Sequence, residues 1–548
     1  MSERPTVGDV VAAFLDACGV GHAFGVISIH NMPILDAIAR QGRIRFIGSR
    51  GEAGAVNMAD AAARVGGCLG VAVTSTGTAA GNACGAMVEA QTAGTPVLHL
   101  TGQIERDYLD RDRGYIHEAR DQLAMLRAVS KAAYRVWSPE TALGMLKEAV
   151  RVALTPPAGP VSVEIPIDVQ EATLDWPADL DPAPVEAPRP SPGAIDALAD
   201  ALASAQRPML WLGGGARHAG AEVGRLTKMG FGVVTSVQGR GVVAEGDSMS
   251  LGSFNLQPAI EAFYGTCDAM VVAGSRLRGN ETLKYTLGLP RPLYQIDADP
   301  AAENRAYPLD RFVTGDSALA LGALADRLEG RMKTDPAFAD DLARAHRAAE
   351  AGMRESLGPY EPILDALLRG VPRDLVWVRD ITLSNSIWGN RLPPLAGPRD
   401  GVHALGGGIG QGIAMAVGAA LAAGGRKTVA LSGDGGFYVS LGELATAVQE
   451  CVDVVFLVMN DKGYGVIRNI QDARFGGRRH YADLHMPDFA DLARTMGLAF
   501  HRVAAPDDMA PALEAALAVD GPALVELDMT AIGPFARPFA GPPVRTSE

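Results

Sequence analysis

Apolar and polar positions follow two regular patterns along this chain. Short apolar runs such as HAFGVI and VDVVFLVMN have the length and β-branched content of buried strands. Stretches such as NMPILDAIAR place apolar residues at helical spacing. The two patterns alternate through residues 1–175, 193–328 and 361–530, as strands joined by covering helices do. The sequence therefore predicts an α/β protein of three doubly wound parallel-sheet domains.

Polar and proline-rich stretches separate these segments. Residues 176–192 hold six prolines, which exclude a long helix or strand. Residues 329–360 are strongly charged and predict exposed helices. The tail, residues 531–548, contains IGPFARPFAGPP and cannot form regular structure. We expect this tail to cover the neighbouring domain as a strap.

The stretch from Val429 to Gly465 carries the clearest chemistry. It is predicted to form a buried strand, a helix (GELATAVQE) and a second buried strand, which is one βαβ unit of a parallel sheet. Asp434 follows the first strand and Asp461 follows the second, 27 residues later. Ligands bind at the carboxyl ends of strands in open α/β sheets, so both side chains are expected at one site.

The residue types at this site favour a hard cation beside a phosphate. Two carboxylates suit Mg²⁺, which prefers a few carboxylates together with phosphate oxygens. Gly433, Gly435 and Gly436 allow the main chain to approach a diphosphate closely. The alternative is an ordinary turn in which Asp434 only caps the following helix.

The GDG motif, the helix and strand after it, and the NDKGYG turn resemble the signature of the thiamine diphosphate (ThDP) enzymes. The resemblance implies that Asp434, Asp461 and the carbonyl of Gly463 hold Mg²⁺ against the diphosphate, with Tyr464 beside the cofactor. Asn460 matches the first of the family's usual two asparagines, whereas Asp461 replaces the second. The three domains would be the pyrimidine-binding, central Rossmann-like and diphosphate-binding domains.

Glu52 is the strongest catalytic candidate. It follows a predicted strand and begins a predicted helix in SRGEAGAVNMADAAARV. A glutamate here can simply favour the helix dipole. In the family, a glutamate in this context bonds the aminopyrimidine N1′ and promotes deprotonation of the thiazolium C2. The resemblance extends to VAVTSTGTAAGN and TPVLHLTGQI, so it spans the segment.

Two further regions match family features. In HALGGGIGQGIAMAVGAALA, Ile409 matches the apolar residue that props the cofactor into a bent shape, and the carbonyl of Gly407 would accept a bond from its 4′-amino group. The central segment resembles the domain that binds FAD in some acetolactate synthases and ADP in oxalyl-CoA decarboxylases. It lacks both a GxGxxG fingerprint and the acidic run of the flavin-binding relatives, so no flavin is expected. Asp297 and Asp299 are candidates for contact with a ribose, but capping of a turn is the first expectation.

Three residues are candidates for contact with substrate. His30 falls on the loop where benzaldehyde lyase carries a substrate-facing histidine. His117 and Glu118 fall where acetolactate synthases carry Phe-Gln and oxalyl-CoA decarboxylases Tyr-Glu. Neutral imidazoles beside a carboxylate can transfer protons near neutral pH. The alternative for each histidine is a solvated or internally bonded side chain.

Composition excludes some functions. A net charge of −14 argues against a nucleic-acid partner, and no apolar run approaches a membrane span. The five cysteines never form a CxxC pair, and residues 1–20 predict an amphipathic helix instead of a signal peptide. A cytoplasmic protein is expected.

Together these features predict a ThDP- and Mg²⁺-dependent enzyme that cleaves or forms a C–C bond next to a carbonyl of a small-molecule substrate. Acetolactate synthase-like decarboxylation or carboligation of a 2-oxo acid is the first expectation. Benzaldehyde-lyase-like acyloin cleavage or ligation, cyclic dione hydrolysis and 2-hydroxyacyl-CoA cleavage remain alternatives, as does a non-catalytic cofactor-binding regulator. By family analogy, a homodimer or homotetramer would form its active sites between subunits.

Overall fold

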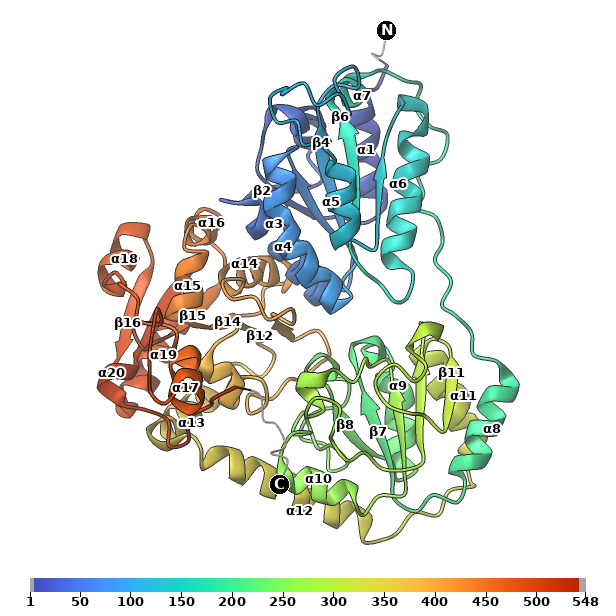
Figure 1. Cartoon of the computed structure of the whole chain (residues 1–548), viewed down its shortest axis with the longest axis vertical. Helices are drawn as coiled ribbons and strands as arrows, with labels where there is room; N and C mark the ends of the chain where they lie inside the picture. Colours follow the sequence, from blue (N-terminus) through green and yellow to red (C-terminus); the bar gives the residue numbers. More distant parts are fainter. Residues whose placement is uncertain (1–3, 542–548) are drawn as a thin grey trace.

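The computed structural model describes residues 4–541, and these form three α/β units in sequence order (Figure 1). Each unit contains one sheet, of six, five and six strands respectively. All strand pairs within these sheets are parallel. The predicted fold class, three parallel-sheet α/β domains, is confirmed.

The first unit has the strand order β2-β1-β3-β4-β6-β5. Its central strand β3 shows why helices cover both faces. Val71 and Val73 pack against the helices α1, α2 and α6, whereas Ala72 between them packs on the side of α3 and α4. The elements are α1 (Val7–Ala17), β1 (His22–Gly25), α2 (Met32–Gln41), β2 (Arg45–Gly48), α3 (Glu52–Gly66), β3 (Gly70–Thr74), α4 (Thr78–Ala93), β4 (Val97–Gln103), α5 (Gln122–Val129), β5 (Ala132–Arg135), α6 (Pro139–Leu154), β6 (Val161–Pro166) and α7 (Ile167–Glu171).

The second unit has the order β11-β10-β9-β7-β8 and is reached through the extended proline-rich connection after residue 175. Asp299 caps a short turn by accepting a hydrogen bond from the N–H of Ala301. The elements are α8 (Pro192–Leu202), β7 (Pro208–Leu212), α9 (Gly220–Lys228), β8 (Gly232–Thr235), α10 (Pro258–Tyr264), β9 (Ala269–Ala273), β10 (Leu293–Asp297), β11 (Arg311–Thr314), α11 (Ser317–Leu328) and the connecting helix α12 (Phe338–Arg354).

The third unit has the order β13-β12-β14-β15-β17-β16. Every residue of β15 is buried, because this β-branched strand lies between β14 and β17 with helices on both faces. The elements are α13 (Glu361–Gly370), β12 (Val376–Arg379), a π-helix (Asn385–Gly389), β13 (Gly401–His403), α14 (Gly412–Ala422), β14 (Thr428–Gly433), α15 (Asp434–Val439), α16 (Glu443–Gln449), β15 (Val454–Asn460), α17 (Gly465–Arg474), α18 (Phe489–Met496), β16 (Ala499–Val503), α19 (Met509–Leu517), β17 (Ala523–Asp528) and α20 (Met529–Ile532).

Two local features differ from the expectation. Between β14 and β15 the chain forms two helices instead of one, because the GDGG segment is itself the first turn of α15. The alternation of strands and covering helices predicts an ordinary helix after β12, whereas Asn385–Gly389 form a π-helix. Such π-turns occur frequently at functional sites.

The first and third units pack against each other through α3 and α14, which lie side by side in Figure 1. Both helices are rich in alanine and glycine, so their backbones approach closely. A Cβ placed on Gly418 would lie 2.6 Å from the Cα of Met58 and even closer to its carbonyl oxygen. Glycine at position 418 is therefore required for this contact.

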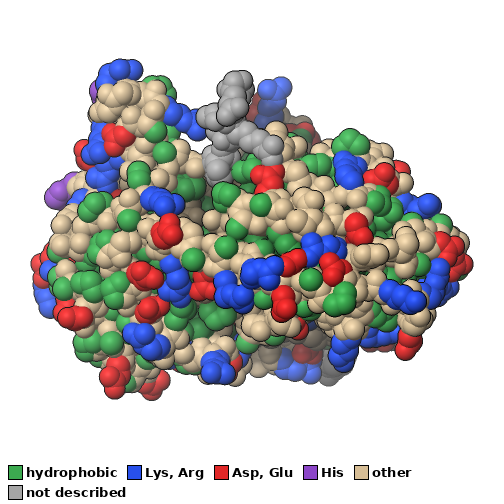
Figure 2. All heavy atoms as spheres, turned by 90° about the horizontal axis from the view of Figure 1, so that it is seen from below, with side chains coloured by type: hydrophobic (Ala, Val, Ile, Leu, Met, Phe, Trp, Pro, Cys, Tyr) green, Lys and Arg blue, Asp and Glu red, His purple; other side chains and the backbone are tan. Residues whose placement is uncertain are grey.

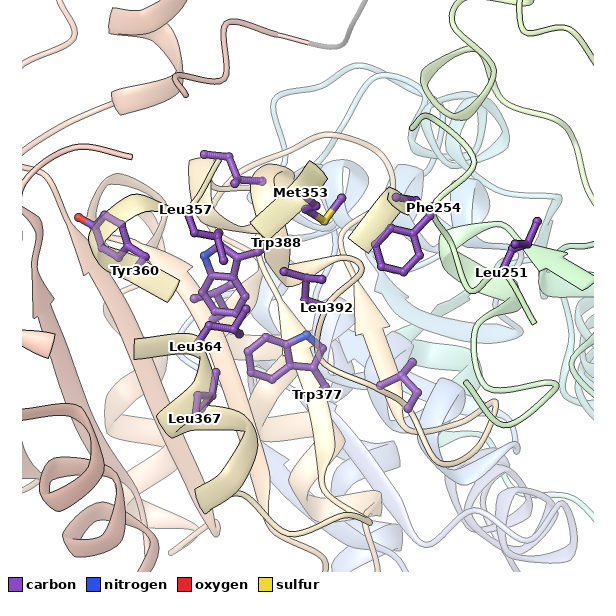
Figure 3. Packing of buried hydrophobic residues seen from close by; sticks show 14 of the residues in the cluster. Leu251, Phe254, Met353, Leu357, Tyr360, Leu364, Leu367, Trp377, Trp388 and Leu392 are labelled. Atoms are coloured by element: carbon purple, nitrogen blue, oxygen red, sulfur yellow. The ribbon is translucent and has the colours of Figure 1, made fainter. Parts of the chain in front are cut away.

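A second core joins the central and third units (Figure 3). Met353, Leu357 and Tyr360 pack toward Trp388, and Phe254 of the central unit continues the same cluster. The helices α12 and α13 thus fix the third sheet against the second.

None of the helices in residues 4–541 is long and apolar enough to cross a bilayer. On the face drawn in Figure 2, acidic and basic side chains are intermixed instead of gathered by sign. Of the tail, residues 542–548 lie outside the described part of the chain.

Candidate active site

The two aspartates expected to bind a cation lie together at the carboxyl ends of adjacent strands. Asp434 follows β14 and Asp461 follows β15, and these strands pair directly. The Oδ2 of Asp434 accepts a hydrogen bond of 2.8 Å from the N–H of Gly463. The GDG motif and the NDKGYG turn therefore meet in space.

The electrostatics of this pair fit a divalent cation. Burial, reinforced by the charge of Asp461, raises the pKa of Asp434 to about 7. Burial also raises the pKa of Asp461, although Arg468 opposes this effect. The Nη2 of Arg468 lies 2.9 Å from the Oδ1 of Asp461, yet that oxygen accepts no well-directed hydrogen bond. A cation at this position would satisfy the oxygen and relieve the repulsion.

No cluster of three or more histidine, cysteine, aspartate or glutamate side chains within residues 4–541 could hold a metal ion. A cation here would therefore be bound by two carboxylates, main-chain carbonyls and its other ligands. That donor set matches the oxygen-only, incompletely protein-bound coordination of Mg²⁺.

The glycines beside the aspartates leave no space for side chains. A Cβ on Gly435 would lie 2.6 Å from the ring of Tyr464, and one on Gly433 would lie 2.8 Å from the Oγ1 of Thr382. A Cβ on Gly436 would lie 3.1 Å from the Oδ2 of Asp380. This part of the chain presents backbone without side chains beside the carboxylates, and binding of a diphosphate here stays a prediction.

The turn before α14 contains the residues expected under the cofactor. Gly407 and Gly410 adopt positive φ angles of 85° and 83°, conformations that favour glycine. Between them, Ile409 is 39% exposed and belongs to an exposed stretch, residues 406–409. Its side chain is therefore available to contact a ligand.

Asp380, at the end of β12, holds the second half of this turn. Its Oδ2 accepts hydrogen bonds of 3.0 Å and 3.1 Å from the N–H groups of Gly410 and Gly412. Burial raises the pKa of Asp380 to about 6 in spite of these bonds. Asp380 belongs to no sequence motif, so its hold on this turn follows only from the structure.

Glu52 is placed as expected, at the first position of α3 directly after β2. Its carboxylate is half-buried and accepts a hydrogen bond of 3.1 Å from the Nδ2 of Asn82 on α4. Among the hydrogen bonds and ion pairs of residues 4–541, none joins Glu52 to Asp434 or to the Gly407 turn of its own chain.

His30 and His117 form a pair beyond the carboxyl ends of β1 and β4 in the first sheet. Their Nδ1 atoms are 3.3 Å apart and the rings meet edge to face. Burial and the neighbouring His117 lower the pKa of His30, so its imidazole is neutral near pH 7. In a hydrogen bond between two Nδ1 atoms, one ring donates and the other accepts.

The loop carrying His117 is built tightly. His117 has a positive φ of 66°, and its main chain lies directly against Gly77. Glu118 accepts hydrogen bonds of 3.0 Å from the N–H groups of Arg113 and Tyr115, and so stabilises this loop. A role for Glu118 in catalysis stays a prediction.

A cavity of about 440 Å³ opens beside Gly407. The central unit contributes Arg278 and Glu281, and the π-helix contributes Asn385, whose buried Oδ1 has no hydrogen-bond partner. The tail forms a further wall: residues 537–541 line the cavity. Arg278, Glu281 and Asn385 lie far apart in sequence and carry no motif, so sequence reasoning missed these three residues.

The tail is attached as the predicted strap. Phe535 stacks on Tyr360 with ring centroids 4.2 Å apart, and the OH of Tyr360 donates to the carbonyl of Gly533. The Nδ2 of Asn469, on α17, donates to the carbonyl of Phe539.

A separate cavity of about 300 Å³ lies at the carboxyl edge of the central sheet. Arg217, Arg276, His218 and Asp297 are among its lining residues. The expectation that no flavin binds here stays a prediction.

Family models and relatives agree with this arrangement. The N-terminal TPP binding domain of thiamine pyrophosphate enzymes matches residues 5–125, the central domain matches residues 195–324, and the C-terminal TPP binding domain matches residues 384–527. A protein of Pseudomonas aeruginosa described as a probable 2-ketoarginine decarboxylase is 30% identical over 535 residues, with 95% of this chain and 94% of that protein covered.

Two further proteins extend the comparison. A catabolic acetolactate synthase of Raoultella terrigena is 30% identical over 544 residues, with 95% and 94% of the two chains covered. The X-ray structure of a candidate thiamin diphosphate-dependent enzyme from Mycobacterium smegmatis superposes with a TM-score of 0.81 at 25% identity, covering 96% of this chain and 99% of that one. The resemblance seen in the sequence is confirmed: this chain belongs to the thiamine diphosphate-dependent enzyme family and is acetolactate synthase-like.

Proposed function

We propose that this protein is a ThDP- and Mg²⁺-dependent enzyme that decarboxylates a 2-oxo acid, with or without transfer of the product to a second carbonyl. The observation that carries the proposal is the pair of the buried Asp434 and the partly buried Asp461 beside backbone that carries no side chains. The relatives described as a decarboxylase and as an acetolactate synthase support the reaction class.

The residues present fit the cofactor and the cation. Asp434, Asp461 and the carbonyl of Gly463 would hold Mg²⁺, and Gly435 and Gly436 would lie along the diphosphate. When bound, ThDP supplies the electron sink on which cleavage of a bond next to a carbonyl depends. The protein would bind and orient the cofactor and the substrate, and it would exclude water from them.

On the cofactor's reactive half, Ile409 would support the bend and the carbonyl of Gly407 would accept from the 4′-amino group. Glu52 would bond the aminopyrimidine N1′ and exchange a proton with it. Because no hydrogen bond or ion pair of the described residues joins Glu52 to the Gly407 turn of its own chain, we infer that it serves the cofactor of a second subunit. The working form would be a homodimer or homotetramer, and we place it in the cytoplasm, where its free cysteines would stay reduced.

The histidine pair would control protons at the substrate. Because the two Nδ1 atoms lie 3.3 Å apart, one ring would donate a hydrogen bond to the other and so fix its orientation. A neutral His30 can deliver or accept a proton near pH 7, within the range where general acid–base catalysis is efficient. This observation favours a second candidate function, cleavage or ligation of acyloins in the manner of benzaldehyde lyase.

A product screen by mass spectrometry tests the proposal. Purified protein with ThDP and Mg²⁺ receives pyruvate, 2-ketoarginine, benzoylformate, benzoin and simple aldehydes, separately and in pairs. The expected result is release of CO₂ from a 2-oxo acid, or transfer of the two-carbon unit of pyruvate to a second compound. Benzoin cleavage without use of any 2-oxo acid would favour the acyloin reaction. Binding of ThDP without turnover of any compound would contradict both.

A further inference from the structure

We propose that Glu89 is a positioning residue that holds the turn before α14 in the shape needed for cofactor binding. The inference rests on the proposed function, since it concerns the turn that would lie under ThDP. Glu89 lies on α4 of the first unit, whereas the turn belongs to the third unit.

Both carboxylate oxygens of Glu89 are used on this turn. Oε1 accepts a hydrogen bond of 2.7 Å from the N–H of Leu405, and Oε2 accepts one of 2.5 Å from the N–H of Gly406. The side chain is only 1% exposed. A carboxylate bonded to two successive N–H groups fixes their orientation, and charged acceptors make stronger hydrogen bonds than neutral ones.

Other side chains reinforce the same contact. Arg64, on α3, donates to Glu89 (3.0 Å), to the carbonyl of His403 (2.7 Å) and to Asp60. Arg278 of the central unit donates to the carbonyl of Leu405 and to that of Thr92. All three units therefore converge on the segment 403–406, just before Gly407.

The turn is thus held at two points by carboxylates from different units. Glu89 binds its start, and Asp380 binds its end at Gly410 and Gly412. Between these points, Gly407 has open space around it and Ile409 is partly exposed. The free segment is the one expected to contact the cofactor. Because both ends of this segment are already fixed, less conformational entropy is lost when it binds the cofactor.

Glu89→Gln is the sharpest perturbation. The amide keeps one acceptor oxygen but directs an NH₂ group at a main-chain N–H, so one hydrogen bond becomes a donor–donor contact. Because the variant loses a hydrogen bond to a charged carboxylate, we expect the dissociation constant of ThDP to rise about 10- to 100-fold. In protein without cofactor, amide hydrogen exchange should accelerate in residues 403–409.

Two further variants separate geometry from charge and from general destabilisation. Glu89→Asp keeps the charge beside Arg64 but is one methylene shorter, so it should also accelerate exchange in the turn. Glu148→Gln removes an exposed glutamate paired with Arg151 on α6 and should leave the turn and ThDP affinity unchanged. Thermal unfolding checks that each variant is folded.

The measurements are hydrogen exchange by mass spectrometry on protein without cofactor, and calorimetry with ThDP and Mg²⁺. Faster exchange confined to the turn, together with weaker ThDP binding, supports the inference. Folded Glu89→Gln with wild-type exchange and wild-type affinity overturns it, as does Glu89→Asp behaving like wild type. Failure of the wild-type protein to bind ThDP overturns the proposed function instead, while the exchange data still report whether Glu89 holds the turn.

Discussion

Replacing Gly418 by alanine tests whether the contact between α3 and α14 is as close as the structure shows. The added Cβ would lie 2.6 Å from the Cα of Met58, whereas carbon atoms in contact are normally about 3.5–4.0 Å apart. Both atoms belong to helix backbones, so no rotamer change relieves the clash. The helices must separate by about 1 Å.

Overpacking of this kind lowers the free energy of unfolding by about 3 kcal/mol. This value is at the upper end of the usual range because the strain falls on the main chain. Alanine regains about 1 kcal/mol over glycine within a helix. The expected net loss of stability is about 2 kcal/mol. Since Glu52 begins α3, a displacement of about 1 Å should also lower activity by about 10²-fold.

The matched control is Gly144→Ala on α6. A Cβ at this exposed helical position meets no atom within 4 Å, so the same substitution should stabilise the protein by about 0.5–1 kcal/mol. Urea unfolding, followed by hydrogen exchange in α3 and α14, measures both variants. Gly418→Ala with stability equal to or above that of Gly144→Ala would refute the close packing.

Three other results are expected. His99 is fully buried between Thr74 and Ser162, and burial lowers its pKa to about 4. Because the unfolded chain therefore binds a proton at higher pH than the folded chain, acidification from pH 7 to 5 should lower the free energy of unfolding by about 2 kcal/mol. Urea midpoints at the two pH values should show a smaller loss for His99→Gln than for the wild type, and an equal loss would contradict this account. Glu52→Gln should slow exchange of the thiazolium C2 proton, followed by NMR, by about 10²–10⁴-fold while ThDP affinity stays within a few fold. Asp434→Asn keeps an acceptor for the N–H of Gly463 but removes a cation ligand, so calorimetry should detect no Mg²⁺-dependent ThDP binding, in contrast to the exposed control Asp472→Asn.

The fold and the acidic pair could be predicted because their signals are local. A β-branched run followed directly by Asp461 needs burial on both faces, and that requirement places its end at the edge of a parallel sheet. The position of Glu52 at the start of α3 follows from the same reasoning.

The rest depends on contacts between distant parts of the chain. Glu89 is an unremarkable helical residue in the sequence, and only the docking of α4 against the third unit brings it to Leu405 and Gly406. His30 and His117 were recognised singly, but their pairing follows from the positions of two loops 87 residues apart. No periodicity or motif carries such information.

The contact between α3 and α14 also has a consequence for synthesis of the chain. The ribosome makes α14 about 350 residues after α3, which at 5–20 residues per second is a delay of roughly 20 to 70 s. During that time the small-residue face of α3 has no permanent partner within the nascent chain. We therefore expect additional chaperones and slower growth at lower temperature to raise the yield of native protein in a heterologous host.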